Sequence, residues 1–186
     1  DSSLQWSVDG IRFHQRWQME NLYCEEDFAA SRYPLHEADP EGRAVTWTIV
    51  KNGMLIHVHK VSPTVGGLFF RQGGYPLGFD TGSPVCRSTG SAEIARIGDR
   101  YSLLADLGGF TSRVPARAFH DQLNGVNTRY VRSVTARLEY RAEEAAERIL
   151  ASAVYANRGG ETDEQLLGLV PAVRQEGELL HFSFSD

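Results

Sequence analysis

This sequence has almost no helical periodicity; the one helix-like window, 141–150, is short and rich in acids. No apolar run approaches the roughly 20 residues needed to cross a bilayer, so we predict no membrane span. Acidic and basic residues are interspersed, and the formal net charge is -5. A basic stripe that could neutralise phosphates is missing, which argues against nucleic acid as a partner.

Cysteine is scarce, because only Cys24 and Cys86 occur in the 186 residues. The two are isolated and lack C-x-x-C spacing, which argues against a zinc ribbon or a redox pair. The sequence leaves a disulfide between them open, but we expect buried free thiols in a reducing, cytoplasmic compartment. The P-loop, the G-x-S-x-G elbow and the dinucleotide fingerprint are also missing, and we expect no cofactor.

Strand patterns are plentiful, and Gly-containing turn pairs such as Asn52-Gly53 separate them. The segments that read as strands are 44–50, 54–61, 67–72, 91–97, 100–107, 129–140, 148–156, 166–173 and 178–185. This pattern predicts an all-β fold, an antiparallel β-sandwich of about nine or more strands with little helix. We expect one domain over 1–186, cut from a longer protein, with residues 25–42 forming a long loop.

The stretch KNGMLIHVHK (51–60) predicts a hairpin, because Asn-Gly favours a two-residue turn with positive φ at both positions. This turn sets Thr48 opposite His57 and Thr46 opposite His59. Side chains alternate along a strand, so two faces separate. The predicted core face carries Val45, Trp47, Ile49, Ile56 and Val58. The polar face carries Thr46, Thr48, His57 and His59, and we expect a ligand, a neighbouring domain or solvent beside it.

Three interpretations of the two histidines stay open at this point. They could be metal ligands, since H-x-H followed by Pro-x-Gly (76–78) is similar to the cupin pattern. However, no carboxylate follows the pair, Thr81 occupies the place of the second-motif histidine, and a metal needs three or four ligands. They could instead be catalytic, or simply hydrogen-bonded to threonines. We expect no bound metal.

Residues 45–80 resemble the bacterial domain-of-unknown-function family 2264, in which a Thr-bearing strand precedes a His-Arg-Ile strand and a Gly-Gly-aromatic loop. Here His59-Lys60-Val61 and Gly73-Gly74-Tyr75 correspond to those elements. Residues 31–35 and 125–144 are similar to two further segments of that family. The sequence departs from the pattern at Met54, His57 and Gln72. The likeness covers most of the chain from about residue 30 onward.

The resemblance implies a C-terminal β-sandwich that follows an N-terminal (α/α) toroid, as in heparinase-like enzymes that act on uronate-containing glycans. An elimination reaction needs a Tyr or His base and a cation that neutralises the uronate. The candidate catalytic residues are His57, His59, Arg71 and Tyr75. The candidate ligand-binding residues are Thr46, Thr48, Arg32 and Trp17. We expect the isolated module to be inert.

A hydrolase would instead need two carboxylates about 5–10 Å apart. Glu25, Glu26 and Asp27 are expected to form a solvated cluster, and Asp80 and Asp106 to cap turns. A free-standing glycan-binding module is the alternative, because such modules stack sugars on exposed aromatic rings. The rings that could serve are Trp6, Trp17, Tyr23 and Tyr33, with Trp47 expected inside the core.

Overall fold

The computed structural model describes residues 5–8, 11–14, 20–36, 39–75, 77–78, 84–121 and 131–185. An eight-stranded sheet contains, in spatial order, β3 (Glu20–Cys24), β4 (Phe28–His36), β5 (Asp39–Lys51), β6 (Met54–Ser62), β14 (Arg148–Arg158), β11 (Arg100–Gly108), β10 (Ala92–Ile97) and β9 (Val85–Thr89). A second sheet contains β12 (Ser112–Asp121), β13 (Val131–Ala142) and β7 (Leu68–Gly73), with β8 (Leu77–Gly78) also paired to β13.

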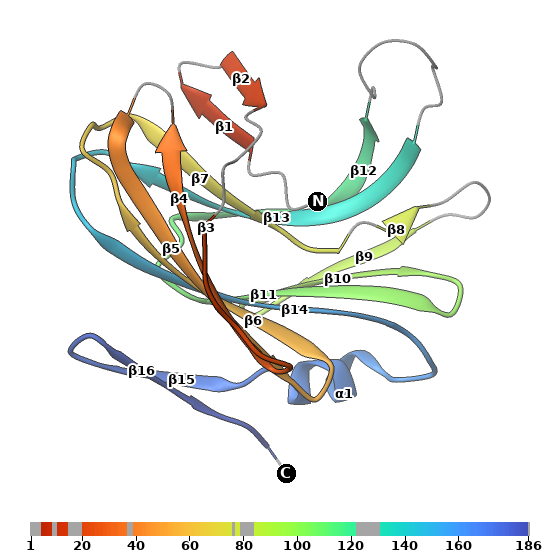
Figure 1. The fold of residues 1–186 in the computed structure, drawn as a ribbon. Coiled ribbons are helices and arrows are strands. Elements are labelled where there is room, and N and C mark those ends of the chain that lie inside the picture. Colours follow the sequence, from red (N-terminus) through yellow and green to blue (C-terminus); the bar gives the residue numbers. More distant parts are fainter. Residues whose placement is uncertain are drawn as a thin grey trace.

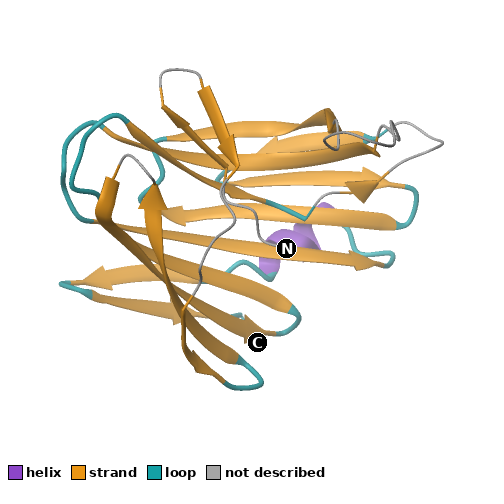
Figure 2. Cartoon of the chain, turned by 45° about the horizontal axis from the view of Figure 1, so that its top comes forward, coloured by secondary structure: helices purple, strands orange, loops and turns teal. Residues whose placement is uncertain are grey.

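Two hairpins and one short helix complete the described chain. The hairpins are β1 (Gln5–Val8) with β2 (Ile11–His14), and β15 (Ala172–Glu176) with β16 (Leu179–Ser183), and the helix is α1 (Asp163–Gly168). All strand pairs are antiparallel. Figure 2 shows strands throughout, with the helix against one side of the sheets. The predicted all-β antiparallel sandwich is confirmed.

The elements form three layers. In Figure 1 the four-stranded sheet lies above the eight-stranded sheet, and α1 with the β15–β16 hairpin lies below it. We call the face of the large sheet toward the small sheet its inner face, and the opposite face its outer face. Other parts of the chain therefore cover part of each face, and Tyr23 at the β3–β4 end of the outer face stays exposed.

Apolar side chains fill both spaces between the layers. On the inner face, Ala44, Val61 and Leu150 pack against Phe70 and Tyr140 of the small sheet. A second inner cluster joins Leu104 and Val154 to Val134 and Leu138. On the outer face, Ile56, Tyr101 and Leu103 pack with Leu166 of α1. Each fully buried Leu, Ile or Phe stabilises the fold by about 1.5–3 kcal/mol through loss of water contact.

Helix α1 occupies the first part of the strand predicted over 166–173, and only 172–173 are in a strand, so that prediction is wrong for most of its length. Thr162 is the N-cap, and its hydroxyl accepts from the Gln165 backbone N–H while the Gln165 side chain accepts from the Thr162 backbone N–H. This reciprocal capping box stabilises the first turn. The T-x-x-Q spacing in the sequence was the local signal for the helix.

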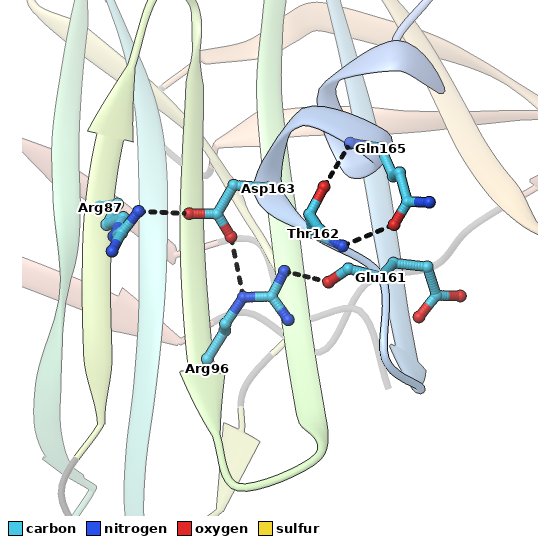
Figure 3. A network of polar contacts seen from close by, with 6 residues as sticks. All are labelled: Arg87, Arg96, Glu161, Thr162, Asp163 and Gln165. Atoms are coloured by element: carbon cyan, nitrogen blue, oxygen red, sulfur yellow. Dashed lines mark hydrogen bonds and ion pairs between the residues drawn. The ribbon is translucent and has the colours of Figure 1, made fainter.

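Ion pairs fix α1 to the edge of the large sheet, as Figure 3 shows. The Asp163 carboxylate accepts from Arg96 Nε on β10 at 2.8 Å and from Arg87 Nη1 on β9 at 3.1 Å. Arg96 also donates to the backbone oxygen of Glu161 at 2.6 Å. The contacts attach the start of the C-terminal cover to two strands that are distant from it in sequence.

One further sequence prediction about secondary structure is wrong, and the one helix-like window is not helical. The expected long loop over 25–42 contains β4 and the start of β5, which pair with each other from Phe28 opposite Ile49. The helix-like window 141–150 holds the end of β13, a turn and the start of β14. Cross-strand partners decide both cases, because tertiary pairing overrides weak local preference.

The predicted hairpin at 51–54 is confirmed in its turn and its register. Asn52 and Gly53 have φ of 52° and 75°, the conformation of a type I′ turn. Thr48 lies opposite His57, and Thr46 lies opposite His59.

Cys24 and Cys86 are free, but both are exposed, which corrects the expectation that they are buried. They lie on β3 and β9, the two outermost strands of the large sheet, so a disulfide within the chain is excluded by position. Within the described residues, no helix is long and apolar enough to cross a membrane.

Candidate functional site

Strand β6 places His57 and His59 on the inner face of the large sheet. Thr46 Oγ1 and His59 Nδ1 share a hydrogen bond of 2.8 Å, and Thr48 Oγ1 and His57 Nδ1 share one of 3.0 Å. The Tyr33 hydroxyl shares a further bond of 3.0 Å with Thr46 Oγ1. The expected polar face is therefore a ladder of threonine–histidine pairs held across β5 and β6.

The structure corrects what covers this face. His59 is 3% exposed, and its ring centroid lies 4.8 Å from that of Phe70 on the small sheet. The ring thus lies inside the sandwich, where neither ligand nor solvent reaches it. Conversely, Trp47 and Val58 of the predicted core face are only partly buried on the outer face. The alternation of the strand was predicted correctly, but the burial of the two faces was not.

Burial keeps both imidazoles neutral near pH 7. It lowers the pKa of His59 to about 3, with the neighbouring His57 adding to the effect, and lowers the pKa of His57 to about 4. His59 Nε2 is buried without a hydrogen-bond partner among the described residues; the Gln72 side chain is close enough to favour protonation, but burial outweighs it. His59 is enclosed and cannot reach a substrate to take a proton from it, and the lowered pKa makes both rings weak bases.

The two rings are not arranged for chelation. They stack nearly parallel, with centroids 5.9 Å apart and an interplanar angle of 18°. Among the residues that the structure describes, no group of three or more His, Cys, Asp or Glu side chains could hold a metal ion. A zinc-type site needs three or four converging ligands, and this ladder brings together two rings and two hydroxyls.

Arg71 and Tyr75 lie away from the histidines. Arg71 follows Phe70 on β7, so it points to the opposite face, where its Nε lies 3.0 Å from Glu139 Oε1. Tyr75 is 39% exposed in the segment after β7, and partial burial raises its pKa. The four candidate catalytic residues therefore do not converge on one point.

Of the other candidate ligand-binding residues, the structure describes Arg32 alone, and it lies apart from the ladder. Arg32 is exposed and pairs with Glu20 on the neighbouring strand at 2.7 Å. Trp17 lies outside the described residues, and the side chain of Trp6 is likewise outside them. Tyr33 is buried and cannot act as a sugar platform. Tyr23 is 47% exposed and stays available for that role.

The carboxylates behave as expected where the structure describes them. Glu25, Glu26 and Asp27 are exposed at the β3–β4 turn. Asp106 accepts a hydrogen bond of 2.8 Å from the Gly108 backbone N–H, the predicted turn-capping role, and partial burial raises its pKa. Asp80 lies outside the described residues. Glu25, Glu26, Asp27 and Asp106 thus give no support to a two-carboxylate hydrolase site.

A cleft that the sequence did not predict lies between the β15–β16 hairpin and the outer face of the large sheet. Its volume is about 1030 Å³, and its lining includes Leu107, Ile149 and Leu180 together with charged residues at the rim. The cleft depends on how far the hairpin stands from the sheet. No local sequence pattern signals that distance.

No family model and no curated protein match this chain, so the resemblance to family 2264 stays a prediction. Solved structures do match. Heparan sulfate lyase HepC from Pedobacter heparinus superposes with a TM-score of 0.59 at 14% identity, over 92% of this chain and 26% of that chain. A mutant of the same lyase gives 0.61 at 12% identity, over 97% and 28%. A heparinase III gene product gives 0.59 at 8% identity, over 97% and 26%.

These identities are low, so the likeness concerns the fold. The chain has the β fold of one region of heparan sulfate lyase chains, and it spans about a quarter of the length of those chains.

Proposed function

We propose that this chain is the β-sandwich module of a larger carbohydrate-active enzyme, of the polysaccharide lyase or glycoside hydrolase type. The observation that carries the proposal is the asymmetry of the structural match. The fold of heparan sulfate lyase chains covers 92–97% of this chain, while this chain covers only 26–28% of theirs. A helical (α/α) toroid in the same protein would carry the catalytic machinery, and uronate-containing glycans would be the substrates.

The geometry of the candidate residues supports an accessory role. His59 is enclosed, Arg71 is paired with Glu139 on another face, and Tyr75 is the exposed member of the predicted catalytic set. Elimination needs a base and a group that neutralises the uronate charge, and both must act on the same sugar at the same time. Because these side chains are dispersed, the module supports a neighbouring domain and contributes at most a group such as Tyr75.

The test is the activity of the purified chain on heparan sulfate and on oligosaccharides containing uronate. Elimination creates an unsaturated uronate, which ultraviolet absorbance detects. We expect no turnover from the chain alone, and activity when the complete protein is assayed under the same conditions. Robust turnover by the chain alone would reject the accessory role.

A glycan-binding module is the second candidate, and one observation favours it. Tyr23, Phe28 and Trp47 lie on the outer face of neighbouring strands, and the Tyr23 and Phe28 ring centroids are 5.7 Å apart. Tyr23 is exposed, and the other two rings are partly buried. Aromatic surfaces of this kind stack on sugar rings.

Calorimetric titration of the chain with a panel of glycans distinguishes the two candidates. Binding that Tyr23→Ala abolishes would favour the glycan-binding module. No detectable binding to any glycan of the panel would favour the accessory module. Val50→Ala, at another exposed position on the same sheet, is the matched control.

A further inference from the structure

The cleft beneath the β15–β16 hairpin has apolar walls on two sides. Leu107 on β11 and Ile149 and Ala151 on β14 form its floor on the outer face of the large sheet. Val173 and Leu180 of the hairpin form the opposite wall. Except for Ala151, these side chains are only partly buried, so the two layers do not close on each other here.

The hairpin is attached at one end. β15 and β16 hydrogen-bond only to each other within the described chain. Phe182, Phe184 and Val170 pack into the outer apolar cluster and fix the base of the hairpin. Residues 174–179 around its turn are exposed, and Leu179 is 65% exposed. The turn end therefore stands away from the sheet, and the cleft opens beneath it.

The rim of the cleft has an excess of negative charge. Four carboxylates and two guanidiniums line it: Glu143, Glu144, Glu147 and Glu178, with Arg141 and Arg148. The Glu147 carboxylate is already paired with Lys60 at 2.9 Å, and its pKa is lowered by that contact. Arg141 lies over the Phe69 ring at 5.3 Å from the centroid. Among the described residues, Glu143 and Glu144 form no ion pair, while Glu178 lies near enough to Lys60 to raise the pKa of that ammonium, so at least two carboxylates can pair with an occupant.

We propose that this cleft binds an extended polypeptide segment that carries lysine or arginine beside aliphatic residues. The apolar floor and hairpin wall would remove aliphatic side chains from water, which is favourable in proportion to the area buried. The carboxylates of the rim would pair with the basic side chains, and complementary charge of this kind selects the partner and its orientation. An acidic glycan would instead meet like charge at the rim.

The volume agrees with an occupant of this size. About 1030 Å³ lies just above the roughly 300–1,000 Å³ typical of ligand sites, enough for several side chains. The occupant differs from the glycan of the proposed function, so failure of one proposal leaves the other standing.

Titration of the intact chain with short synthetic peptides tests the inference. One probe alternates leucine and lysine, a second replaces each lysine by glutamate, and a third replaces each leucine by serine. Calorimetry gives the affinity, and backbone amide shifts of the isotope-labelled chain locate the site. We expect the leucine–lysine peptide alone to bind well, with the largest shifts at Leu107, Ile149 and Leu180. Affinity should fall as salt is added.

Charge reversal at the rim supplies the matched comparison. Glu144→Lys combined with Glu178→Lys should weaken the leucine–lysine peptide about tenfold. Glu26→Lys, an exposed carboxylate at the β3–β4 turn, should leave the affinity unchanged. If the double variant loses its fold by circular dichroism, Glu178→Gln at the exposed turn replaces it, with a smaller loss expected.

Three outcomes would overturn the inference. They are equal binding of the glutamate peptide, shifts that lie outside the cleft, and full affinity in the charge-reversed variant. A heparan sulfate oligosaccharide that, in the absence of peptide, bound the chain and shifted the amides of the cleft would also reject it, because the rim would then accept an anion.

Discussion

The two faces of the eight-stranded sheet are built differently. The inner face at β5 and β6 carries Thr46, Thr48, His57 and His59, yet it lies against the small sheet. The outer face carries Ile56 and other apolar residues, and α1 and the C-terminal hairpin cover much of it. The threonine–histidine ladder of the inner face is therefore covered by the small sheet. The apolar outer face is instead covered by the C-terminal segment that contains α1 and the β15–β16 hairpin.

This difference shows what holds each layer together. The outer cover gains stability from apolar contact, which is proportional to buried area. The inner ladder must exchange water for internal hydrogen bonds, and any buried group that loses its partner costs about 1–3 kcal/mol. Substitutions on the two faces should thus lower the free energy of unfolding for different reasons, and the size of the effect should depend differently on pH.

The largest effect is expected at the outer cover. Leu166→Ala should lower the free energy of unfolding by about 2–5 kcal/mol, because Leu166 is fully buried between α1 and the sheet and its truncation leaves a cavity. Urea denaturation measures the change. Leu179→Ala, at a position that is 65% exposed, should change stability by less than about 0.5 kcal/mol. Equal effects at the two positions would mean that α1 does not close the outer face.

Acid should destabilise the inner face. Burial holds the pKa of His59 at about 3 and that of His57 at about 4, below the unfolded value of about 6.5. The unfolded chain therefore binds more protons between these values, and stability is full above pH ~6.5 and is lost as the pH falls. The loss should reach about 2–3 kcal/mol per pH unit near pH 5.

Urea denaturation across this pH range measures the slope. The double variant His57→Gln with His59→Gln should flatten it, whatever its stability at pH 7. A slope that stays unchanged in the variant would assign the acid response to other groups.

Two threonines on one strand should respond unequally. Thr46→Val removes the partner of both His59 and Tyr33 in a buried site, and should cost about 2–3 kcal/mol. Thr48→Val affects only the partly buried His57, and should cost about 0.5–1 kcal/mol. Thermal or urea unfolding of the two variants measures the difference. If Thr48→Val proved the more harmful, the burial order along the ladder would be reversed.

The smallest effect is expected at the edge of the outer cover. Asp163→Asn weakens the ion pairs with the partly buried Arg96 and the exposed Arg87, and should cost about 1 kcal/mol. Glu176→Gln, in the exposed pair with Arg174, should cost about 0–0.5 kcal/mol. Unfolding at low and high salt provides the check, since screening should shrink the Asp163 effect.

Most of the central strands could be predicted from sequence, because they alternate clearly and end at glycine turns. The Asn52-Gly53 turn even fixed the pairing of Thr46 with His59, since only a few turn types fit that dipeptide. What covers each face could not be predicted. His59 lies under Phe70 because β7 returns across β6, and no periodicity within 51–60 carries that information.

The wrong or missing sequence predictions have one physical cause, because tertiary contacts decide the structure at each of these places. Strand β4 is stable because β3 and β5 flank it, although Pro34 and the charged Arg32 give it weak strand character. The apolar run over 166–173 has the pattern of a strand. The Thr162–Gln165 capping box nevertheless starts helix α1, and Leu166 of this helix packs on the outer face of the large sheet. The cleft of about 1030 Å³ depends on the distance between the β15–β16 hairpin and the large sheet. That distance is set only when the layers assemble, so no local sequence pattern predicts it.

An NMR titration of the two imidazole rings tests the enclosure of the inner ladder most directly. We predict that His59 titrates near pH 3 and His57 near pH 4, or that both stay neutral until the fold is lost. If His57 and His59 instead titrated together near 6.5, the rings would be open to solvent and the account of the two faces would be wrong.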